Sequence, residues 1–368
     1  MNTTQGVRHS RETRFVTKNI AGVVHSVKAG VAEVRFPAWN PGASACHNCD
    51  GVFVSRIVCL SLRPMPLRKF IKSAVRRLPG KRLIFSAIRL FGVPPFYRSL
   101  RFDGLFPVRL TGETSILLRN IDEYSLETEW FWRGITGWEA ASIQNWMNLR
   151  RSRAIGASPT IMDIGACEGI YALVASALAP DSKVLAVEPL PEAFKRLEAN
   201  VSLNKKPIYT FEVACSDCDG SVPFYSDGCA NSTEGSLLSS AGRTSTCVVK
   251  TRTVSSLLKE SGLSSVDLLK IDVEGAEPAV IRGMEDYLAS SRPVMLVEVL
   301  NDKVAEDLAE IMSRWNYCYW DINDDPRNGA LGLRSAPWIR NGICLNWLFV
   351  PVEKEPVLRK CWSEWLLK

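Results

Sequence analysis

The second half of the chain is predicted to form an α/β fold with a mainly parallel sheet. From residue 160 onward, short apolar runs alternate with stretches whose apolar residues recur at helical spacing, which is typical of helices covering a parallel sheet. Two segments support the prediction, residues 163–169 (DIGACEG) and 270–277 (KIDVEGAE), because each closes a strand-like run and opens a helix-like run. Ligands of such folds bind at the carboxyl ends of the strands, so both segments are candidates for a functional site.

The individual elements follow from the same patterns. Seven strands are expected, at residues 160–164, 184–188, 208–213, 266–271, 294–299, 317–322 and 347–350. Helices are expected near residues 169–178, 192–204, 276–289 and 303–315. The last two strands have no helix between them, so the final strand should run antiparallel to its neighbours. The Ser-, Gly- and Thr-rich stretch 219–252 should leave the sheet and form the rim of a site.

The remaining chain divides by composition. Residues 1–64 show weak periodicity, so we expect a poorly ordered extension and regard Met65 as a candidate for the true start. Residues 65–150 should form a basic amphipathic helix and an aromatic-rich cap, followed by the main domain at 151–352 and a C-terminal tail at 353–368. The cap should contain a hairpin with strands at 106–110 and 115–118. Its aromatic cluster should pack the cap against the main domain and consists of Trp130, Phe131, Trp132, Trp138 and Trp146.

Charge is distributed unevenly along the chain. The net charge is +6, yet residues 51–102 contain twelve Lys and Arg residues and no Asp or Glu. Within this stretch, residues 67–78 have the pattern of a basic amphipathic helix. Such a helix either lies on an anionic membrane surface or packs on the domain with its charges in water, and the sequence leaves both alternatives open. No nucleic acid partner is expected, because the basic stretch lies outside the candidate catalytic region.

Cysteine and histidine usage restricts the function classes. Eleven cysteines, an odd number, indicate a reducing compartment, so we expect a cytoplasmic protein, peripheral to the inner face of the membrane if the basic helix binds lipid. The C-x-x-C pairs at 46–49 and 215–218 lack the second pair of a zinc site, and we assign no metal site. The three histidines are His9, His25 and His47. Hydrolases with a serine–histidine pair and histidine-dependent dehydrogenases are therefore poor candidates.

The first segment is expected to hold a cofactor. Gly165 and Gly169 allow a tight turn between strand and helix, but the segment matches neither the GxGxxG dinucleotide pattern nor a phosphate-binding P-loop. Asp163 at the strand end favours a cationic ligand, which points to S-adenosylmethionine. Glu188, at the end of the second strand, should accept hydrogen bonds from the ribose hydroxyls. Asp217 is a weaker candidate for the adenine edge, with a solvated loop acid as the alternative.

These motifs resemble the FkbM family of S-adenosylmethionine-dependent methyltransferases. The resemblance runs from about residue 65 to about residue 351 and is most specific at residues 268–277. It implies a class I methyltransferase fold, a seven-stranded Rossmann-like sheet, and methylation of hydroxyl oxygens, often on sugars or natural products. Cys167 and Glu168 stand where family members usually have Asn and an apolar or small residue. The other matching segments are residues 163–169, 187–191, Asn200, 214–217 before Gly220 and, more weakly, 131–132 and 137–139.

Mapping these motifs onto the chain gives further candidates for cofactor contact. They include Ala166 in the first segment and Glu139, which follows Trp138 in the cap. Pairing between cap and core is the alternative role for Glu139. An ordinary strand-to-helix turn is the alternative for Asp163 and Gly165.

The second segment is expected to carry the chemistry. Strand alternation places Lys270, Asp272 and Glu274 on one side, and Glu298 ends the next strand. Methyl transfer to a hydroxyl requires in-line positioning and removal of one proton, and with no histidine available we rank Asp272 first as base, then Glu274, with Lys270 as partner or base. Helix capping is the alternative role for Glu274 and for Glu277. Assistance by a divalent cation stays open.

We therefore expect an O-methyltransferase that acts on a hydroxyl of a sugar, glycan, glycolipid or related natural product. The alternative is a non-catalytic module that binds a cofactor or glycan on the same scaffold, because a fold does not determine its function. The acceptor and the oligomeric state are left open by the sequence.

Overall fold

The computed structural model describes residues 80–121, 125–226, 235–237, 245–325, 327, 332–340 and 345–366. They belong to one compact unit, residues 65–368. The expected extension 1–64 and the expected amphipathic helix 67–78 lie outside the described residues. No helix in the described ranges is both long enough and apolar enough to cross a membrane.

The main sheet has eight strands in the order β13-β12-β14-β11-β10-β3-β4-β5. The parallel pairs join β3, β4, β5, β10 and β11, whereas the last strand, β14, runs antiparallel to both of its neighbours, as predicted. The eighth strand, β13, forms a hairpin with β12 that the sequence analysis missed. The strand bounds are β3 (Thr160–Ile164), β4 (Lys183–Val187), β5 (Ile208–Phe211), β10 (Leu268–Ile271), β11 (Val294–Glu298), β12 (Tyr317–Asn323), β13 (Gly332–Ala336) and β14 (Asn346–Pro351).

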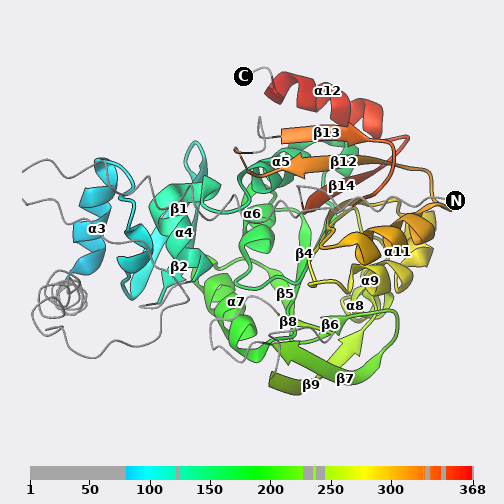
Figure 1. Ribbon diagram of the computed structural model, residues 1–368, viewed down its shortest axis with the longest axis horizontal. Helices are drawn as coiled ribbons and strands as arrows, with labels where there is room; N and C mark the ends of the chain where they lie inside the picture. The colour runs from blue at the N-terminus through cyan, green and yellow to red at the C-terminus, as the bar shows by residue number, and fades with distance from the viewer. Residues whose placement is uncertain are drawn as a thin grey trace, which may run out of the picture. The chain divides into compact units, whose positions relative to one another are not determined.

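Helices cover both faces of this sheet, so its central strands are buried throughout (Figure 1). Alternate residues point into two separate apolar clusters: Ile161 and Leu268 into one, Met162 and Leu269 into the other. The first cluster includes α5 (Ala140–Arg151) and α6 (Ile170–Leu178), and the second includes α8 (Val254–Glu260), α9 (Glu277–Arg282) and α11 (Asp302–Met312). Besides these, α7 (Pro191–Asn204) follows β4.

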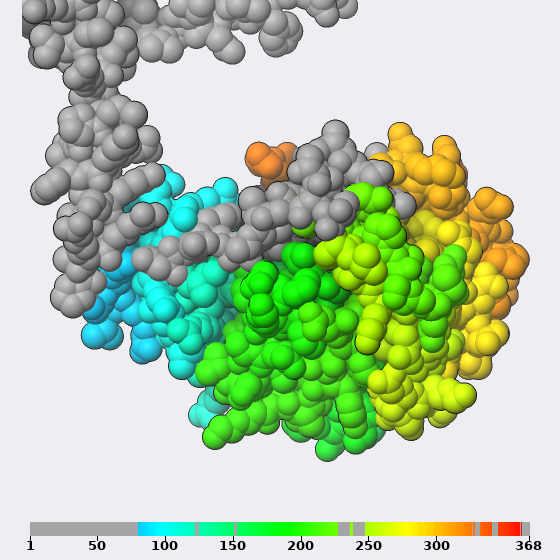
Figure 2. Space-filling view, turned by 90° about the horizontal axis from the view of Figure 1, so that it is seen from below, coloured from blue at the N-terminus to red at the C-terminus, as the bar shows by residue number. Residues whose placement is uncertain are grey.

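The cap is built from α3 (Lys81–Leu90), the predicted hairpin of β1 (Gly104–Thr111) and β2 (Thr114–Asn120), and α4 (Leu126–Arg133). Short 3-10 turns connect its parts at Tyr97–Ser99, Gly134–Thr136 and Arg153–Ile155. The cap is fastened to α7, because the Asn204 side chain exchanges hydrogen bonds with the Leu117 backbone and Asn200 Oδ1 accepts from Arg119 N. Figure 2 shows the blue and cyan cap against the green surface that includes α7.

Three stretches differ from the sequence-based expectations. The excursion 219–252 contains β7 (Gly220–Ser226), β8 (Gly235–Ser236) and β9 (Ser245–Arg252), which form a small second sheet together with the preceding β6 (Ala214–Cys215). The expected helix 276–289 is divided into α9 and α10 (Glu285–Ser290), with Gly283 between them, where a Cβ would be 2.2 Å from the Ser216 carbonyl oxygen. The stretch assigned to a tail contains α12 (Glu355–Leu366), whose Leu358 and Trp362 are buried in the first apolar cluster.

Gly165 has a steric role that can be separated from its backbone conformation. Gly165 and Gly156 both have positive φ, 79° and 85°, but only at Gly165 would a Cβ collide with a backbone atom, the Asp272 oxygen, at 1.7 Å. We predict that Gly156→Ala lowers the free energy of unfolding by about 1–2 kcal/mol, the usual cost of the left-handed region. Gly165→Ala should cost about 3 kcal/mol or more, because backbone must also move. Urea unfolding of both variants tests this, and equal losses would contradict it.

Candidate active site

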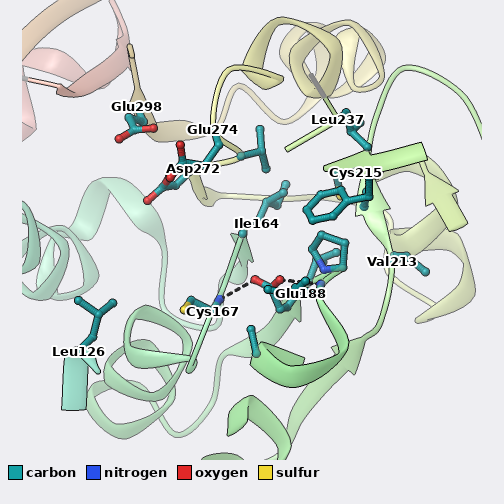
Figure 3. Close-up of a pocket in the computed structure, with 18 of the residues that line it drawn as sticks. Leu126, Ile164, Cys167, Glu188, Val213, Cys215, Leu237, Asp272, Glu274 and Glu298 are labelled. Carbon is teal, nitrogen blue, oxygen red and sulfur yellow. Dashed lines mark hydrogen bonds between the residues drawn. The ribbon is translucent and has the colours of Figure 1, made fainter. Parts of the chain in front are cut away.

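A cavity of about 340 Å³ lies at the carboxyl ends of the central strands. From β3 the chain adds β4 and β5 on one side of the sheet, and from β10 it adds β11 on the other side. The strand order therefore reverses between β3 and β10. Such a switch point is where open α/β sheets bind ligands. The cavity is lined by the ends of β4, β10 and β11, by the β3–α6 turn and by the cap (Figure 3).

The β3–α6 turn forms one wall of the cavity. The Gly165 and Ala166 amides both donate to the Val187 carbonyl, at 2.9 and 3.0 Å, which holds the turn against β4. Cys167 has a φ of 50°, in the left-handed region that Asn tolerates better than most residues, so the Asn usual in the family suits this backbone. Gly165 and Cys167 line the cavity, whereas Ala166 and Gly169 do not. Gly169 instead faces Leu197, where a Cβ would lie 2.4 Å from its Cδ1 atom.

Glu188 lies where the sequence placed it, at the end of β4 and on the cavity wall. Its Oε2 accepts from the Cys167 amide at 2.9 Å and its Oε1 from the Leu190 amide at 2.8 Å (Figure 3). Burial raises the pKa of Glu188 to about 7. Each carboxylate oxygen has a second lone pair, so Glu188 can accept further hydrogen bonds from a ligand in the cavity.

The opposite wall beyond β5 is apolar. Val213, Phe224 and Leu237 line it, and such a surface suits a flat aromatic base. Asp217 does not line the cavity: its side chain is half exposed and lies 3.8 Å from Arg282.

Asp163 also lies away from the cavity lining. Its carboxylate is buried beneath the turn, and Oδ2 accepts from the Ala172 amide in the first turn of α6 at 2.9 Å. Burial raises its pKa to about 6, against the opposing effect of Lys270. Asp163 is thus placed to stabilise the start of α6 and to face Lys270.

Lys270 and Asp272 form a close ion pair at the end of β10. Lys270 Nζ is 2.6 Å from Asp272 Oδ2 and 4.7 Å from the centre of the Tyr171 ring. Lys270 itself is buried, and Asp272, Glu139 and Asp163 together raise its pKa despite its burial. Asp272 lines the cavity and its side chain is 24% exposed, so its carboxylate is accessible to a ligand.

Glu298 faces the same part of the cavity (Figure 3). It is 8% exposed, and its Oε2 atom has no hydrogen-bond partner among the described residues. Burial and then the neighbouring Asp272 charge raise its pKa well above the usual range. A buried carboxyl group without a partner is costly, so this oxygen is suited to a ligand.

Glu139 lines the cavity and also joins the cap to the core. Its Oε2 accepts from the Tyr171 hydroxyl at 2.7 Å and its Oε1 from the Asn346 amide at 3.0 Å. Burial raises its pKa, whereas Lys270 opposes the shift. Sequence reasoning missed Tyr171 and Asn346, because nothing in their local pattern indicates contact with a residue as far as 207 positions away.

The two acidic residues after Asp272 have different surroundings. Glu277 Oε1 accepts from the Val273 and Gly275 amides at 3.0 and 3.1 Å, so its side chain holds the turn between β10 and α9. Glu274 has a φ of 57° and lines the cavity. In the described parts of the chain, no group of three or more His, Cys, Asp or Glu side chains is arranged to hold a metal ion.

A second charged cluster beneath the turn was also missed by the sequence. Arg196 on α7 lies 3.6 Å from the Glu127 carboxylate of α4 and donates to Cys167 Sγ at 3.6 Å. Burial and the adjacent Glu168 raise the pKa of Glu127 to about 7. This cluster connects α4, α7 and the turn, so the cap contacts the cavity wall through charged groups.

The charge of the cavity lining fits a cationic ligand. Five carboxylates line it, and the described lining residues include no Lys, Arg or His; the acids are Glu139, Glu188, Asp272, Glu274 and Glu298. S-adenosylmethionine carries a sulfonium and an ammonium group, whereas dinucleotides and nucleoside triphosphates are polyanions. The acidic lining of the cavity therefore suits S-adenosylmethionine.

A family model described as the methyltransferase FkbM domain matches residues 163–319. The chain carries an FkbM-family methyltransferase domain. The matched region begins at the β3–α6 turn and includes both β10 and β11. S-adenosylmethionine is the cofactor of this family.

Two relatives of the FkbM domain have names that specify a reaction. The chain is 32% identical over 149 residues to the 2-O-methyltransferase NoeI of Sinorhizobium fredii, covering 36% of this chain and 60% of NoeI. It is 28% identical over 159 residues to the hexuronic acid methyltransferase AglP of Haloferax volcanii, covering 42% and 61% respectively. The chain thus spans about three fifths of the length of these relatives.

Solved methyltransferase structures are similar over part of the chain. One is the methyltransferase FkbM from Methylobacillus flagellatus, with 14% identity, a TM-score of 0.35 and coverage of 52% of this chain and 44% of that one. Another is a SAM-dependent methyltransferase from Agrobacterium tumefaciens, with 12% identity, a TM-score of 0.38 and coverage of 68% and 71%.

The buried carboxyl groups predict how stability depends on pH. The pKa of Glu127, Glu188 and Glu277 is raised from 4.5 to about 7. Between these values the folded protein binds more protons than the unfolded chain, so the free energy of unfolding should fall as pH rises from about 4.5 to about 7, by on the order of 1 kcal/mol per pH unit for each group. Denaturation midpoints measured across this range test the slope.

Substitution should identify one contributor to that slope. Glu127→Gln should make the fall in the free energy of unfolding with pH shallower. Glu353→Gln should leave it unchanged, because Arg292 lowers the pKa of Glu353 to about 2, outside this range. Equal slopes in the wild type and Glu127→Gln would show that Glu127 titrates normally.

Proposed function

We propose that this protein transfers the methyl group of S-adenosylmethionine to a hydroxyl oxygen of a sugar, glycan, glycolipid or related natural product. The observation that carries the proposal is the acidic cavity, without a described cationic lining residue, at the switch point between β3 and β10. The names of NoeI and AglP, which specify 2-O-methylation and a hexuronic acid, support oxygen transfer and a sugar acceptor.

S-adenosylmethionine supplies an activated methyl group when bound, so the residues of this chain need to orient the acceptor and accept its proton. Asp272 is our candidate base, because Lys270 fixes Oδ2 at 2.6 Å while the residue faces the cavity. A base positioned in this way contributes about two to four orders of magnitude in rate. Lys270 is a positioning residue, since it is buried and lies outside the lining.

Glu298 and Glu274 have other roles in this proposal. The raised pKa of Glu298 keeps a proton on its carboxyl group at a higher pH than usual, so this group can donate a hydrogen bond to the acceptor oxygen. Glu274 lines the cavity next to Asp272 and is the second candidate base. Glu188 is proposed to accept from the ribose hydroxyls and Glu139 to hold the cap at the site.

Removal of the Asp272 charge tests the proposed base. Asp272→Asn should lower kcat at least about 100-fold, while the dissociation constant of S-adenosylhomocysteine, measured by calorimetry, stays within a few-fold of the wild type. Asp103→Asn, which changes an exposed carboxylate paired with Arg119 on the hairpin, is the matched control. Near-normal turnover in Asp272→Asn would remove Asp272 as the base. A folded wild type that binds S-adenosylhomocysteine but methylates none of a panel of glycosides would favour a non-catalytic module.

We also propose that the cap contacts an anionic membrane surface through α3. Its apolar outer face repeats at helical spacing and includes Leu83, Leu90 and Phe91, which are 70%, 85% and 95% exposed. Phe85 on the other face is buried, and Arg89 donates to the Phe131 carbonyl. Because residues 51–102 contain no acidic residue, their charge complements anionic lipid headgroups.

Vesicle binding tests the contact. The protein should co-sediment with phosphatidylglycerol vesicles and much less with phosphatidylcholine vesicles. Leu90→Glu combined with Phe91→Glu should weaken binding at least about tenfold, because burial of one such side chain contributes about 1.5–3 kcal/mol. Val248→Glu, at a 76% exposed position on β9, should bind normally. Equal binding by all three proteins would exclude this face as the contact.

A further inference from the structure

One member of the aromatic cluster behaves differently from the others. Four members are at most 1% exposed and pack the cap as the sequence predicted; these are Trp130, Phe131, Trp132 and Trp146. Trp138 is 43% exposed and lines the cavity. Single exposed apolar side chains are common, so the exposure matters only together with the way the chain holds this residue.

The backbone on both sides of Trp138 is held firmly. Gly137 lies so close to α4 that a Cβ would be 2.6 Å from the Glu129 carbonyl oxygen. Glu139 adopts a φ of 44°, in a region that L-residues rarely occupy, and both oxygens of its side chain are bound. Strained residues persist where the surrounding structure fixes them, and they cluster at functional sites.

The helix that follows is held as well. Asp324 Oδ1 accepts from the Ala141 and Ser142 amides at 2.7 and 2.8 Å, and Oδ2 accepts from the Ser142 hydroxyl at 2.5 Å. These bonds satisfy amides in the first turn of α5, which otherwise lack partners. The chain therefore presents an exposed indole ring to the cavity from a segment that is fixed before and after it.

Trp138 lines the cavity and directly precedes Glu139, whose carboxylate is bound by Tyr171 and Asn346. Its neighbour Glu139 lies close enough to Lys270 and Asp272 for both charges to affect its pKa. The apolar wall that suits the adenine ring is formed by other elements, with Val213, Phe224 and Leu237. The cavity thus has one exposed aromatic surface, next in the chain to Glu139, and a separate apolar surface that suits an adenine.

We propose that Trp138 is the platform on which a pyranose ring of the acceptor stacks. This inference rests on the proposed methyl transfer to a sugar. A pyranose has an apolar face of C–H groups and an edge of hydroxyls, so it requires an aromatic surface together with polar groups at the side. Trp138 supplies the surface, and Asp272 and Glu298 supply carboxyl groups for the hydroxyls. Trp138 is then a residue that determines acceptor affinity and not cofactor affinity.

The test compares two exposed tryptophans. Trp138→Ala removes the proposed platform, Trp138→Phe retains a smaller one, and Trp338→Ala removes an indole that is 59% exposed but does not line the cavity. Each full-length protein is titrated with S-adenosylhomocysteine by calorimetry. Binding of p-nitrophenyl glucoside, mannoside, fucoside and glucuronide is then measured by saturation-transfer NMR with and without S-adenosylhomocysteine. KM and kcat are determined for any glycoside that is methylated.

The wild type should receive saturation transfer to the ring protons of at least one glycoside. Trp138→Ala should weaken that binding and raise KM about tenfold, Trp138→Phe should lie between it and the wild type, and Trp338→Ala should match the wild type. The dissociation constant of S-adenosylhomocysteine should change less than about twofold in all variants.

Different results would overturn different statements. Absence of glycoside binding by the wild type, or equal binding by Trp138→Ala, would overturn the platform. Weaker S-adenosylhomocysteine binding in Trp138→Ala with unchanged glycoside binding would also overturn it, by assigning the ring to the cofactor. Failure of the wild type to bind S-adenosylhomocysteine at all would instead contradict the proposed methyl transfer, while the glycoside measurement without cofactor still decides the platform.

Discussion

The organisation of the site depends on one buried cation. Lys270 lies in the middle of the sheet with almost no contact with water, and burial of an ammonium group alone would be costly. The cost is offset by the ion pair with Asp272 at 2.6 Å, by the Tyr171 ring at 4.7 Å and by the charges of Glu139 and Asp163. Because these partners come from β10, α6, the cap and β3, one charge fixes the relative positions of four elements around the cavity.

The cap takes part in this arrangement. Glu139 reaches Tyr171 on α6 and Asn346 on β14, and Asp324, after β12, binds the start of α5. On the other side, Arg196 and Glu127 connect α7 with α4. Polar groups buried at such a junction need specific partners, so the cap can occupy few positions relative to the sheet. This explains how residues of the cap can serve a site whose other residues end the strands.

The sequence predicted the elements and the strand-end residues well, because both depend on local pattern. Alternation of strand and helix indicated a parallel sheet, and the strand ends indicated Glu188, Asp272 and Glu298, which the structure brings to one cavity. The prediction was less informative for Asp163, at a strand end, and for Asp217, in a loop, since neither position shows toward which side a carboxylate turns. The hairpin strand β13 and the small second sheet were missed because their segments are rich in turn residues.

The partners that fix the site could not be found in this way. The bonds from Asp324 to Ser142 and from Asn346 to Glu139 span 182 and 207 residues, and no local periodicity encodes a contact at that separation. Cys167 illustrates the same limit at short range. Its backbone lies in the left-handed region, for which cysteine has no preference, and its amide donates to Glu188 Oε2, 21 residues away.

The charge of the cavity also bears on the acceptor. Asp272 and Glu274 line the part of the cavity proposed for the reacting hydroxyl, and a carboxylate or phosphate brought beside them would meet like charges at reduced dielectric. A neutral hydroxyl meets no such repulsion, and a protonated Glu298 could donate to it. If the acceptor carries an acidic group, that group should therefore lie away from these carboxylates, so that the hydroxyl edge of the ring enters the cavity first.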